Sequence, residues 1–447
     1  MDPARRAALE ILNAVTERDA YANLISSSVL AEHGLFGRDA AFATELANGT
    51  LRRYGGYDQI LAGLVSRPLE RLDPQVRNVL RLGAHQLLSM RVPAHAAVAT
   101  SVQLARELVG VGPAGMVNAV LRKVDGRDLA GWLTGLAPEY EQDPIGHLAV
   151  TNFHPRWVAQ AFADALDGSL AEVEELLRAD NEPPAVTLVA WPGRSDPGEL
   201  GGRPGRWSPY ARVLPEGDPR TVPAVAERRA AVQDEGSQLV ALALANAPLV
   251  GEDRRWLDLC AGPGGKAALL AGLAAARDAR LLAGELQPTR ARLVSGALQD
   301  AAGVLGTVCA DGTRPPWAPG VFDRVLVDAP CTGLGALRRR PEARWRRDPA
   351  DLERLRLLQV ALLRSGLRSL RPGGVLAYVT CSPHRSETRS VLDAVLNDDS
   401  AERTTVELVD VRRSLPDVPD LGPGPDVQLW PHRHGTDAMY LALLRRV

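Results

Sequence analysis

Residues 256–273, WLDLCAGPGGKAALLAGL, decide the fold of the second half of the chain. A short apolar run leads into a glycine-rich turn, and an Ala- and Leu-rich segment typical of a helix follows. Glycines between a strand and a helix let backbone N–H groups approach a ligand closely. The turn satisfies neither GxxxxGK[ST] nor GxGxxG, so neither a P-loop nor the dinucleotide fingerprint is predicted. A tight turn without a ligand is the alternative.

Short apolar runs and helical patterns alternate from here onward. The runs RLLAGEL, GTVCA, RVLVDA and GVLAYVTC begin at residues 280, 306, 324 and 374, and helical patterns such as TRARLVSGALQDA lie between them. Alternating strands and helices predict βαβ units and an α/β, doubly wound, Rossmann-like parallel sheet. Ligands bind such sheets beyond the carboxyl ends of the strands.

The first part of the chain has a different pattern. RRAALEILNAV, VRNVLRLGAHQLL and VATSVQLARELV carry apolar residues at helical spacing, with Gly and Pro breaks between them, which predicts an all-α bundle. The middle is less regular, with one helical pattern, NFHPRWVAQAFADAL, and one strand pattern, AVTLVAW. We therefore expect a multi-domain chain: a helical bundle at 1–128, a small α+β connecting domain at 129–230 and an α/β domain at 231–447.

The composition is that of a soluble globular protein, with 447 residues, 45% hydrophobic and 24% charged residues, and a formal net charge of −2. No run approaches the roughly 18 apolar residues of a membrane span, and the N-terminus lacks the apolar core of a signal peptide. We expect a cytoplasmic protein, a monomer by default. Four cysteines without a CxxC pair argue against a disulfide framework, and we expect no metal site. Lysine occurs only at Lys123 and Lys266, so the amine of Lys266 is informative.

Acids follow the next two predicted strands. Glu285 lies about twenty residues beyond the turn, an offset typical of an acid that binds ribose hydroxyls, and Asp311 follows the third strand on the adenine side. Each acid alone is more often a cap or a solvated residue. Together with the turn they indicate an adenosine ligand without a long polyphosphate, and S-adenosylmethionine fits better than NAD. The predicted cofactor-binding residues are Cys260, Ala261, Gly262, Pro263, Gly264, Gly265, Lys266, Glu285, Asp311 and Asp328.

Two cysteines stand just past predicted strands, beside Pro and small polar residues. Cys331 follows VLVDA and Cys381 ends VLAYVTC. Free cysteine is often buried as a small hydrophobe, and we apply that interpretation to Cys309 and mostly to Cys260. A thiolate can instead attack C6 of a pyrimidine and make C5 nucleophilic enough to accept a methyl group, provided that the thiol pKa is lowered and an acid is near. Asp328, three residues before Cys331, is placed to contact the N3/N4 edge of cytosine.

Several stretches together resemble a known family. LDLCAGPGGKA, VDAPCTGLGALRRRPEARW and YVTCSP are similar to the signature motifs of RNA cytosine C5-methyltransferases, and RNVLRLGAHQLL, VPAHAAVATSVQLA and GMVNAVLRKV are similar to the NusB-like RNA-binding domain. The combination resembles the RsmB/Sun branch, which methylates a cytosine in 16S ribosomal RNA. The resemblance implies that Cys381 is the nucleophile, that Cys331 assists release of the methylated base, and that Asp328 contacts the base, the methionine end of the cofactor or both.

The sequence departs from the pattern of this family in VATSV of the helical part, at Met439–Tyr440 near the end, and at two positions of the predicted cofactor site. Gly262 stands where the family often has alanine, and Glu285 stands where aspartate is commoner. The longer arm of glutamate can still reach a ribose. No residue is identified as the base that removes the C5 proton.

An arginine-rich segment follows Cys331. We predict that it contacts RNA by phosphate binding and base stacking, although most such runs are solvated helix starts. The predicted RNA-binding residues are Arg338, Arg339, Arg340, Arg344, Trp345 and Arg346.

Two rivals to the ribosomal RNA methyltransferase remain open: a tRNA cytosine C5-methyltransferase, and a noncatalytic RNA-binding or antitermination factor. An amino-methyltransferase is disfavoured, because DAPC stands where the Asn/Asp-Pro-Pro-aromatic motif of that chemistry is expected.

Overall fold

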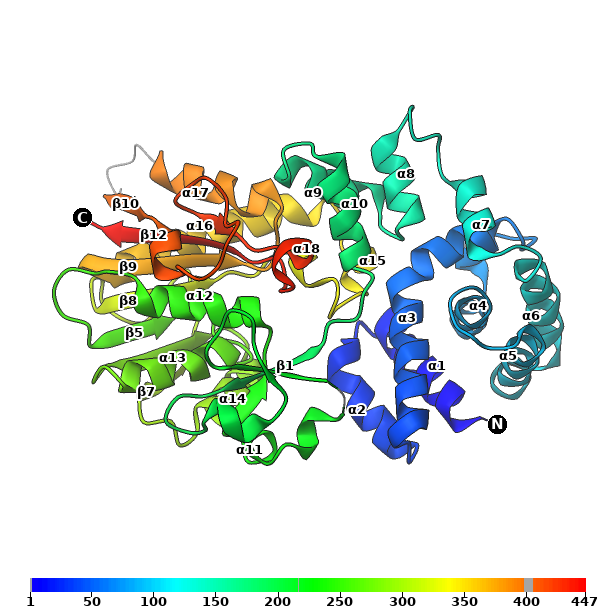
Figure 1. Ribbon diagram of the computed structural model, residues 1–447, viewed down its shortest axis with the longest axis horizontal. Helices are drawn as coiled ribbons and strands as arrows, with labels where there is room; N and C mark the ends of the chain where they lie inside the picture. The colour runs from blue at the N-terminus through cyan, green and yellow to red at the C-terminus, as the bar shows by residue number, and fades with distance from the viewer. Residues whose placement is uncertain (1, 216, 398–404) are drawn as a thin grey trace. The chain divides into compact units, whose positions relative to one another are not determined.

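The chain divides into two compact units. The computed structural model describes residues 2–215, 217–397 and 405–447 (Figure 1). The helical unit, as we call it, comprises residues 1–182 and 337–347, and the sheet unit comprises residues 183–336 and 348–447. None of the helices in the described residues combines the length and the apolarity that a membrane crossing requires.

Helices build the helical unit. Those before residue 182 are α1 (Pro3–Glu17), α2 (Ala22–Glu32), α3 (Gly37–Ala62), α4 (Pro74–Leu88), α5 (Ala94–Leu108), α6 (Val111–Val124), α7 (Leu129–Leu136), α8 (Pro144–Thr151), α9 (Arg156–Ala165) and α10 (Leu170–Ala179). In α1 and α4 an aspartate, Asp2 or Asp73, caps the backbone N–H groups and a proline takes the first helical position. The apolar faces of the helices, such as those of α1 and α3, pack into one core that includes Leu12 and Leu46. The predicted all-α bundle is confirmed.

The middle segment, which we expected as a domain at 129–230, is divided between the two units at residue 182. Its helices α7 to α10 belong to the helical unit. Its strands form a small antiparallel sheet in the order β2-β3-β1-β4, from β1 (Val186–Ala190), β2 (Arg203–Pro204), β3 (Ala211–Leu214) and β4 (Ala230–Val232). One side of β1, with Leu188, packs on a small local cluster, whereas Val189 joins the main core of the sheet unit. This shared core explains why the small sheet is not separate.

The large sheet has the order β10-β12-β9-β8-β5-β6-β7, with β11 paired to β12. Its strands are β5 (Arg255–Asp258), β6 (Arg280–Glu285), β7 (Val304–Cys309), β8 (Phe322–Asp328), β9 (Leu370–Thr380), β10 (Val406–Val409), β11 (Val427–Gln428) and β12 (Tyr440–Arg446). The run from β9 to β7 is parallel, whereas β12 and β10 are antiparallel additions at one edge. The predicted doubly wound parallel sheet is therefore confirmed, with an antiparallel extension.

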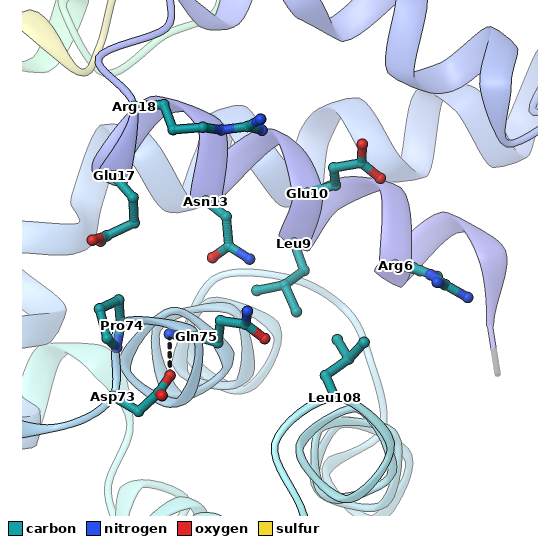
Figure 2. Close-up of a pocket in the computed structure, with 10 residues that line it drawn as sticks. All are labelled: Arg6, Leu9, Glu10, Asn13, Glu17, Arg18, Asp73, Pro74, Gln75 and Leu108. Atoms are coloured by element: carbon teal, nitrogen blue, oxygen red, sulfur yellow. Dashed lines mark hydrogen bonds between the residues drawn. The ribbon is translucent and has the colours of Figure 1, made fainter.

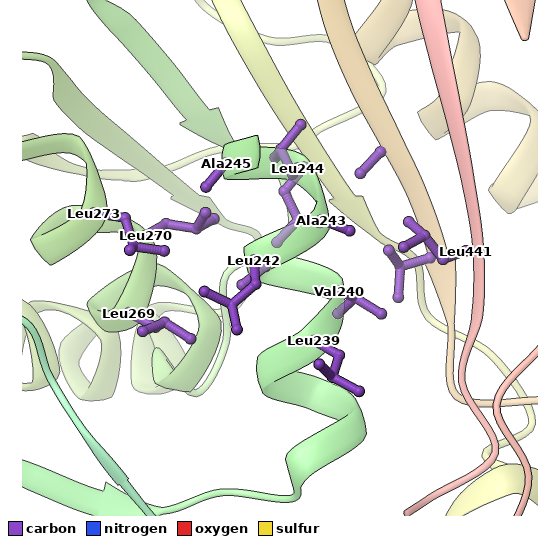
Figure 3. Close-up of a cluster of buried hydrophobic side chains, with 14 of the residues drawn as sticks. Leu239, Val240, Leu242, Ala243, Leu244, Ala245, Leu269, Leu270, Leu273 and Leu441 are labelled. Carbon is purple, nitrogen blue, oxygen red and sulfur yellow. The ribbon is translucent and has the colours of Figure 1, made fainter. Parts of the chain in front are cut away.

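Helices cover both faces of this sheet. One core contains α12 (Glu235–Asn246), α13 (Gly265–Ala275) and α14 (Pro288–Leu298), and Figure 3 shows its leucines around Leu242 and Leu270. The other contains α16 (Asp351–Ser369) and α17 (Arg389–Leu396). Successive strand residues alternate between the two: Leu326 faces the first core, whereas Val325 and Val327 face the second. A sheet covered on both faces accounts for the near-continuous apolar strand sequences.

The strand order reverses between β5 and β8. The chain proceeds from β5 to β6 and β7 on one side, and continues with β8 and β9 on the other side of β5. Such a reversal opens a crevice beyond the carboxyl ends of the strands, where ligands of this fold class bind. The predicted site residues follow the ends of these strands.

The helical unit holds a cavity of about 570 Å³ beside α1, the start of α4 and the end of α5 (Figure 2). Its lining residues are Arg6, Leu9, Glu10, Asn13, Glu17, Arg18, Asp73, Pro74, Gln75 and Leu108. The lining contains more acids than bases, which does not favour an anionic ligand such as RNA. None of the predicted site residues lines this cavity.

Candidate active site

The glycine-rich turn joins β5 to α13 and depends on glycine at two places. Gly264 has a φ of +109°, and a Cβ there would stand 2.8 Å from the Cβ of Ala297. At Gly262 a Cβ would stand 2.2 Å from Oε2 of Glu285. The turn is therefore packed against the strand end that carries the predicted ribose-binding acid.

Glu285 ends β6 and is 5% exposed. Its Oε2 accepts the N–H of Gly262 at 3.0 Å, and its Oε1 accepts the N–H of Gln287 at 2.9 Å. A carboxylate has about four acceptor positions, so Glu285 could still accept two ribose hydroxyls. Arg290 donates to the carbonyl of Gly262 at 2.7 Å, on the exposed side of the turn.

Asp311 follows β7 and is exposed. Its Oδ1 accepts the N–H of Thr313 at 2.9 Å and the Thr313 hydroxyl at 2.8 Å. The backbone bond, followed by the hydroxyl bond, lowers the pKa of Asp311. This carboxylate caps a local turn in the structure, so its contact with an adenosine remains a prediction.

An ion pair occupies the middle of the site. Nζ of Lys266, at the start of α13, lies 2.8 Å from Oδ2 of Asp328, at the end of β8. Burial, the largest single cause, lowers the pKa of Lys266, but the attraction of Asp328, together with the charges of Cys381 and Asp258, raises that pKa on balance. The rare lysine is thus held as a cation that compensates an acid at the crevice.

Asp258, at the end of β5, adds a second carboxylate and is 1% exposed. Burial, followed by the negative charge of Asp328, raises the pKa of Asp258 to about 7, and Lys266 opposes the rise. Burial and the charges of Asp258, Asp328 and Glu285 together raise the pKa of the Cys260 thiol well above its usual value. Asp258 and Asp328 lie near the Lys266 ammonium and Glu285 lies near Asp258, so carboxyl groups outnumber ammonium groups here, which favours a ligand with a positive charge.

The side chains of the two predicted cysteines are in contact. Sγ of Cys331, beyond β8, lies 3.4 Å from Sγ of Cys381, beyond β9, and both residues are partly buried. The contact with Cys381, followed by burial, raises the pKa of Cys331 well above its usual value. A sulfur that keeps its proton can donate a hydrogen bond to the neighbouring sulfur.

The backbone around the thiols is tightly packed. The N–H of Gly335 donates to the carbonyl of Cys381 at 2.9 Å, and the N–H of Ala438 donates to the carbonyl of Gly335 at 2.8 Å. A Cβ at Gly335 would stand 2.0 Å from the Ala438 oxygen. Glycine at this position therefore lets three chain segments approach one another at the thiol pair.

Residues that the sequence did not single out complete this region. Glu387 is fully buried and accepts the backbone N–H of Thr332 at 2.8 Å. Thr332 follows Cys331, and its hydroxyl lies 3.0 Å from that of Ser382, which follows Cys381. The proximity of Glu387 to YVTCSP was the only signal, and charged residues close to a turn are usually solvated.

The interpretation of Cys309 as a small buried hydrophobe was wrong. Cys309 is exposed, and its thiol donates to the carbonyl of Leu286 at 3.4 Å. It ends β7, an edge strand of the large sheet in which no side chain is fully buried.

Arg344, which we expected to bind RNA, lies inside the helical unit. Its side chain is fully buried and donates to the carbonyls of Phe153 and Asp180, at 3.1 and 3.0 Å, and to Oδ1 of Asn181 at 2.8 Å. Burial lowers the pKa of this guanidinium, and the carboxylate of Asp180 opposes the change. The phosphate contact predicted for Arg344 does not fit a side chain without exposed surface.

The neighbours of Arg344 also serve the packing of the helical unit. Trp345, in α15 (Ala343–Arg346), packs on the core with its ring centroid 5.5 Å from that of Tyr54. Arg346 donates to the carbonyls of Val15 and Ala20, at 2.9 Å each. The base stacking predicted for Trp345 would require it to leave these contacts.

The start of the same segment remains a candidate for RNA contact. Arg340 is exposed, with its guanidinium 5.5 Å from the ring centroid of Tyr21. The carbonyl of Arg338 accepts a hydrogen bond from Arg52, and Arg338 and Arg339 are partly buried. RNA contact by these three arginines stays a prediction.

Comparisons with known proteins identify the family of this chain. A family model described as "16S rRNA methyltransferase RsmB/F" matches residues 244–445, and the NusB family model matches residues 2–126. The ribosomal RNA small subunit methyltransferase B of Pseudomonas putida is 34% identical over 80% of this chain and 81% of its own length. A Mycobacterium tuberculosis protein, MT1451, is 53% identical over 100% of this chain and 97% of its own, and its name provisionally assigns methyltransferase activity without a substrate.

Solved structures share the fold. The crystal structure of PH0851 superimposes with a TM-score of 0.83 at 21% identity and covers 100% of this chain and 99% of its own. The structure of NSun6 from Pyrococcus horikoshii with SFG has a TM-score of 0.54 at 18% identity, over 66% of this chain and 98% of its own. The matching sequence models and the similarity to the Pseudomonas enzyme show that the chain belongs to the RsmB/F family of ribosomal RNA methyltransferases.

Proposed function

We propose that the chain transfers a methyl group from S-adenosylmethionine to C5 of a cytosine in 16S ribosomal RNA, through a covalent bond between Cys381 and C6 of the base. The observation that carries this proposal is the 3.4 Å separation of the Cys331 and Cys381 sulfurs at the ends of adjacent strands. A pair of thiols at this place, beside the Lys266–Asp328 ion pair, supports nucleophilic catalysis with a second sulfur for release.

The residues present fit S-adenosylmethionine by their chemistry. This cofactor carries a positive sulfonium and a positive ammonium, and the site has an excess of carboxylates around Lys266. Glu285 would hold the ribose, and Asp258 and Asp328 would face the charged methionine end. When bound, the cofactor supplies an electrophilic methyl group.

The two thiols have different roles in the proposed reaction. The Cys381 thiolate adds to C6, and the electrons of the C5–C6 double bond make C5 nucleophilic. Asp328 holds the N3/N4 edge of the base and stabilises the ring in this state. After C5 has accepted the methyl group, it loses its proton, the C5–C6 double bond re-forms, and the C6–S bond breaks. Cys331 assists this last step by protonating the departing sulfur.

The RNA substrate follows from the family and the helical unit. The NusB family match and the names of the relatives support ribosomal RNA, and a small-subunit cytosine is the proposed target. A tRNA cytosine remains the second candidate, since the same thiol chemistry serves either RNA.

Two cysteine variants test the mechanism. Each is incubated with S-adenosylmethionine and 16S ribosomal RNA, and protein–RNA adducts that survive denaturation are counted. We expect Cys331→Ala to accumulate an adduct, because release is impaired, and Cys381→Ala to form none. Reversed results would exchange the two roles while the reaction stands. A wild-type protein that binds cofactor and methylates tRNA instead of 16S RNA would overturn the substrate.

A further inference from the structure

Glu387 is a buried carboxylate between the two thiol-bearing turns. Its Oε2 accepts the hydroxyl of Thr332 at 2.5 Å, and its Oε1 accepts the backbone N–H of Thr332 at 2.8 Å and the side-chain amide of Gln359 at 3.1 Å. The same amide of Gln359 donates to the carbonyl of Pro330 at 2.9 Å. Both residues that flank Cys331 are therefore held by hydrogen bonds: Thr332 by the Glu387 carboxylate, and Pro330 by Gln359.

A chain of hydroxyls continues from Glu387 to the other thiol. The single hydroxyl proton of Thr332 is donated to Glu387, so the Ser382 hydroxyl, 3.0 Å away, must donate to Thr332. The oxygen of Ser382 in turn accepts the N–H of His384 at 3.3 Å. Each hydrogen bond in this series is therefore donated in the direction of the Glu387 carboxylate. The series reaches the second thiol because Ser382 directly follows Cys381.

We propose that Glu387 is a positioning residue of the active site: through Thr332 and Ser382, its carboxylate fixes the separation of the Cys331 and Cys381 sulfurs. The geometric part of the inference is independent of the reaction, whereas its catalytic consequence rests on the proposed function. A carboxylate accepts from all its partners at once, but a glutamine side chain would present an NH₂ group to at least one donor.

The charge of Glu387 adds a second effect. It raises the pKa of Cys331, after the contact with Cys381 and burial, which are the larger causes. Together these causes keep Cys331 protonated beside Cys381. Loss of this charge would lower the pKa of Cys331, but the two larger causes remain, so Cys331 keeps its proton and the main effect of Glu387→Gln falls on the placement of the two sulfurs.

The sulfur separation can be tested without RNA. In a Cys309→Ser background, which removes an exposed thiol, the azo compound diamide takes one hydrogen from each of the two thiols, becomes a hydrazine and leaves a Cys331–Cys381 disulfide. The rate of formation is followed by the mass of the linked peptides. We expect Glu387→Gln and Thr332→Val to slow it on the order of tenfold or more, because a small misplacement of reacting atoms is costly.

Matched variants separate positioning from folding. Glu353→Gln removes an exposed carboxylate on α16 and should oxidise at the wild-type rate. Thr332→Ser keeps the hydroxyl and should recover most of the rate lost in Thr332→Val. If Glu387→Gln fails to fold, Thr332→Val carries the same test. Oxidation of Glu387→Gln or of a folded Thr332→Val at the wild-type rate would overturn the proposal.

A second readout connects the geometry to catalysis. In 16S RNA methylation, Glu387→Gln should lower kcat with an unchanged KM for RNA and unchanged cofactor binding, and should accumulate the denaturation-resistant adduct. A purely structural role would lower the melting temperature without raising the adduct fraction. If the wild type methylates no cytosine, the proposed function fails, and the disulfide rates still decide the role of Glu387.

Discussion

The Sγ atom of Cys331 lies 3.4 Å from the Sγ atom of Cys381, although fifty positions separate them in the chain. Both follow adjacent parallel strands whose register pairs Asp328 with Val379, and the N–H of Ala329 donates to the Val379 carbonyl at 2.9 Å. A shift of one residue would displace one thiol by about 3.3 Å along its strand. Sheet register therefore brings the sulfurs together, and the contacts of the following turns refine their separation.

The buried acid Asp258 should make stability depend on pH. Its pKa rises from 3.8 to about 7 in the folded protein. Between these values the folded state keeps a proton that the unfolded state has lost, so the free energy of unfolding falls as pH rises to 7 and stays low above it. Asp258→Asn removes this loss, which amounts to about 4 kcal/mol at most.

The measurement is denaturant unfolding without cofactor at pH 5.5 and 8.5. The gain in stability of Asp258→Asn over wild type should be larger at pH 8.5, by about 2 kcal/mol. Asp278→Asn, at an exposed position with a φ of +54° that asparagine tolerates, is the control. An equal gain at both pH values would contradict the raised pKa of Asp258.

Arg344 should act on stability rather than directly on RNA. Arg344→Met leaves the carbonyls of Phe153 and Asp180 without their buried donor, which is expected to cost about 3–5 kcal/mol. Thermal unfolding measures this cost, and Arg340→Met, an exposed change in the same segment, should leave the melting temperature close to that of wild type. Weaker RNA binding by Arg344→Met at an unchanged melting temperature would instead support the phosphate contact expected from the sequence.

Gly55 provides an independent test of the Trp345 packing. Alanine in a helix interior is usually favoured over glycine by up to about 1 kcal/mol. At Gly55 in α3, however, a Cβ would stand 2.1 Å from the ring of Trp345. We expect Gly55→Ala to destabilise the protein by about 1–3 kcal/mol. Gly115→Ala, in α6 with no atom within 4 Å of the added Cβ, should be neutral or stabilising, so equal effects of the two changes would argue against the packing.

Strand ends could be predicted from the sequence, but the burial of single charges could not. Glu285, Asp328 and Cys381 end apolar runs, and runs of this kind identify buried parallel strands and their carboxyl ends. Arg344 and Glu387 stand in polar stretches that resemble solvated surface. Their burial depends on partners far along the chain, 191 positions away for the contact of Arg344 with Phe153. Such contacts leave no pattern in the neighbouring sequence. Arg344, whose side chain is buried in the structure, was therefore interpreted from the sequence as a phosphate contact.

Two of the departures from the family pattern, Gly262 and Glu285, form one structural feature. The space left by the missing Cβ of Gly262 is occupied by the longer arm of Glu285, whose Oε2 would lie 2.2 Å from that Cβ. Gly262→Ala alone should displace the carboxylate, and Glu285→Asp alone should lose the 3.0 Å bond to the Gly262 N–H. Each single change is expected to weaken binding of S-adenosylmethionine.

Together the two changes should weaken cofactor binding less than the sum of the single effects. The shorter aspartate makes room for the alanine methyl group, so we expect a favourable coupling of about 1–2 kcal/mol between the two sites. Calorimetric titration of the wild type, both single variants and the double variant with S-adenosylmethionine measures this cycle. Glu285→Asp combined with Gly115→Ala, which lies in the helical unit and shares no contact with Gly262, should be additive. If the effects of Gly262→Ala and Glu285→Asp are equally additive, the two residues do not share this space, and the glutamate reaches the ribose without help from the glycine.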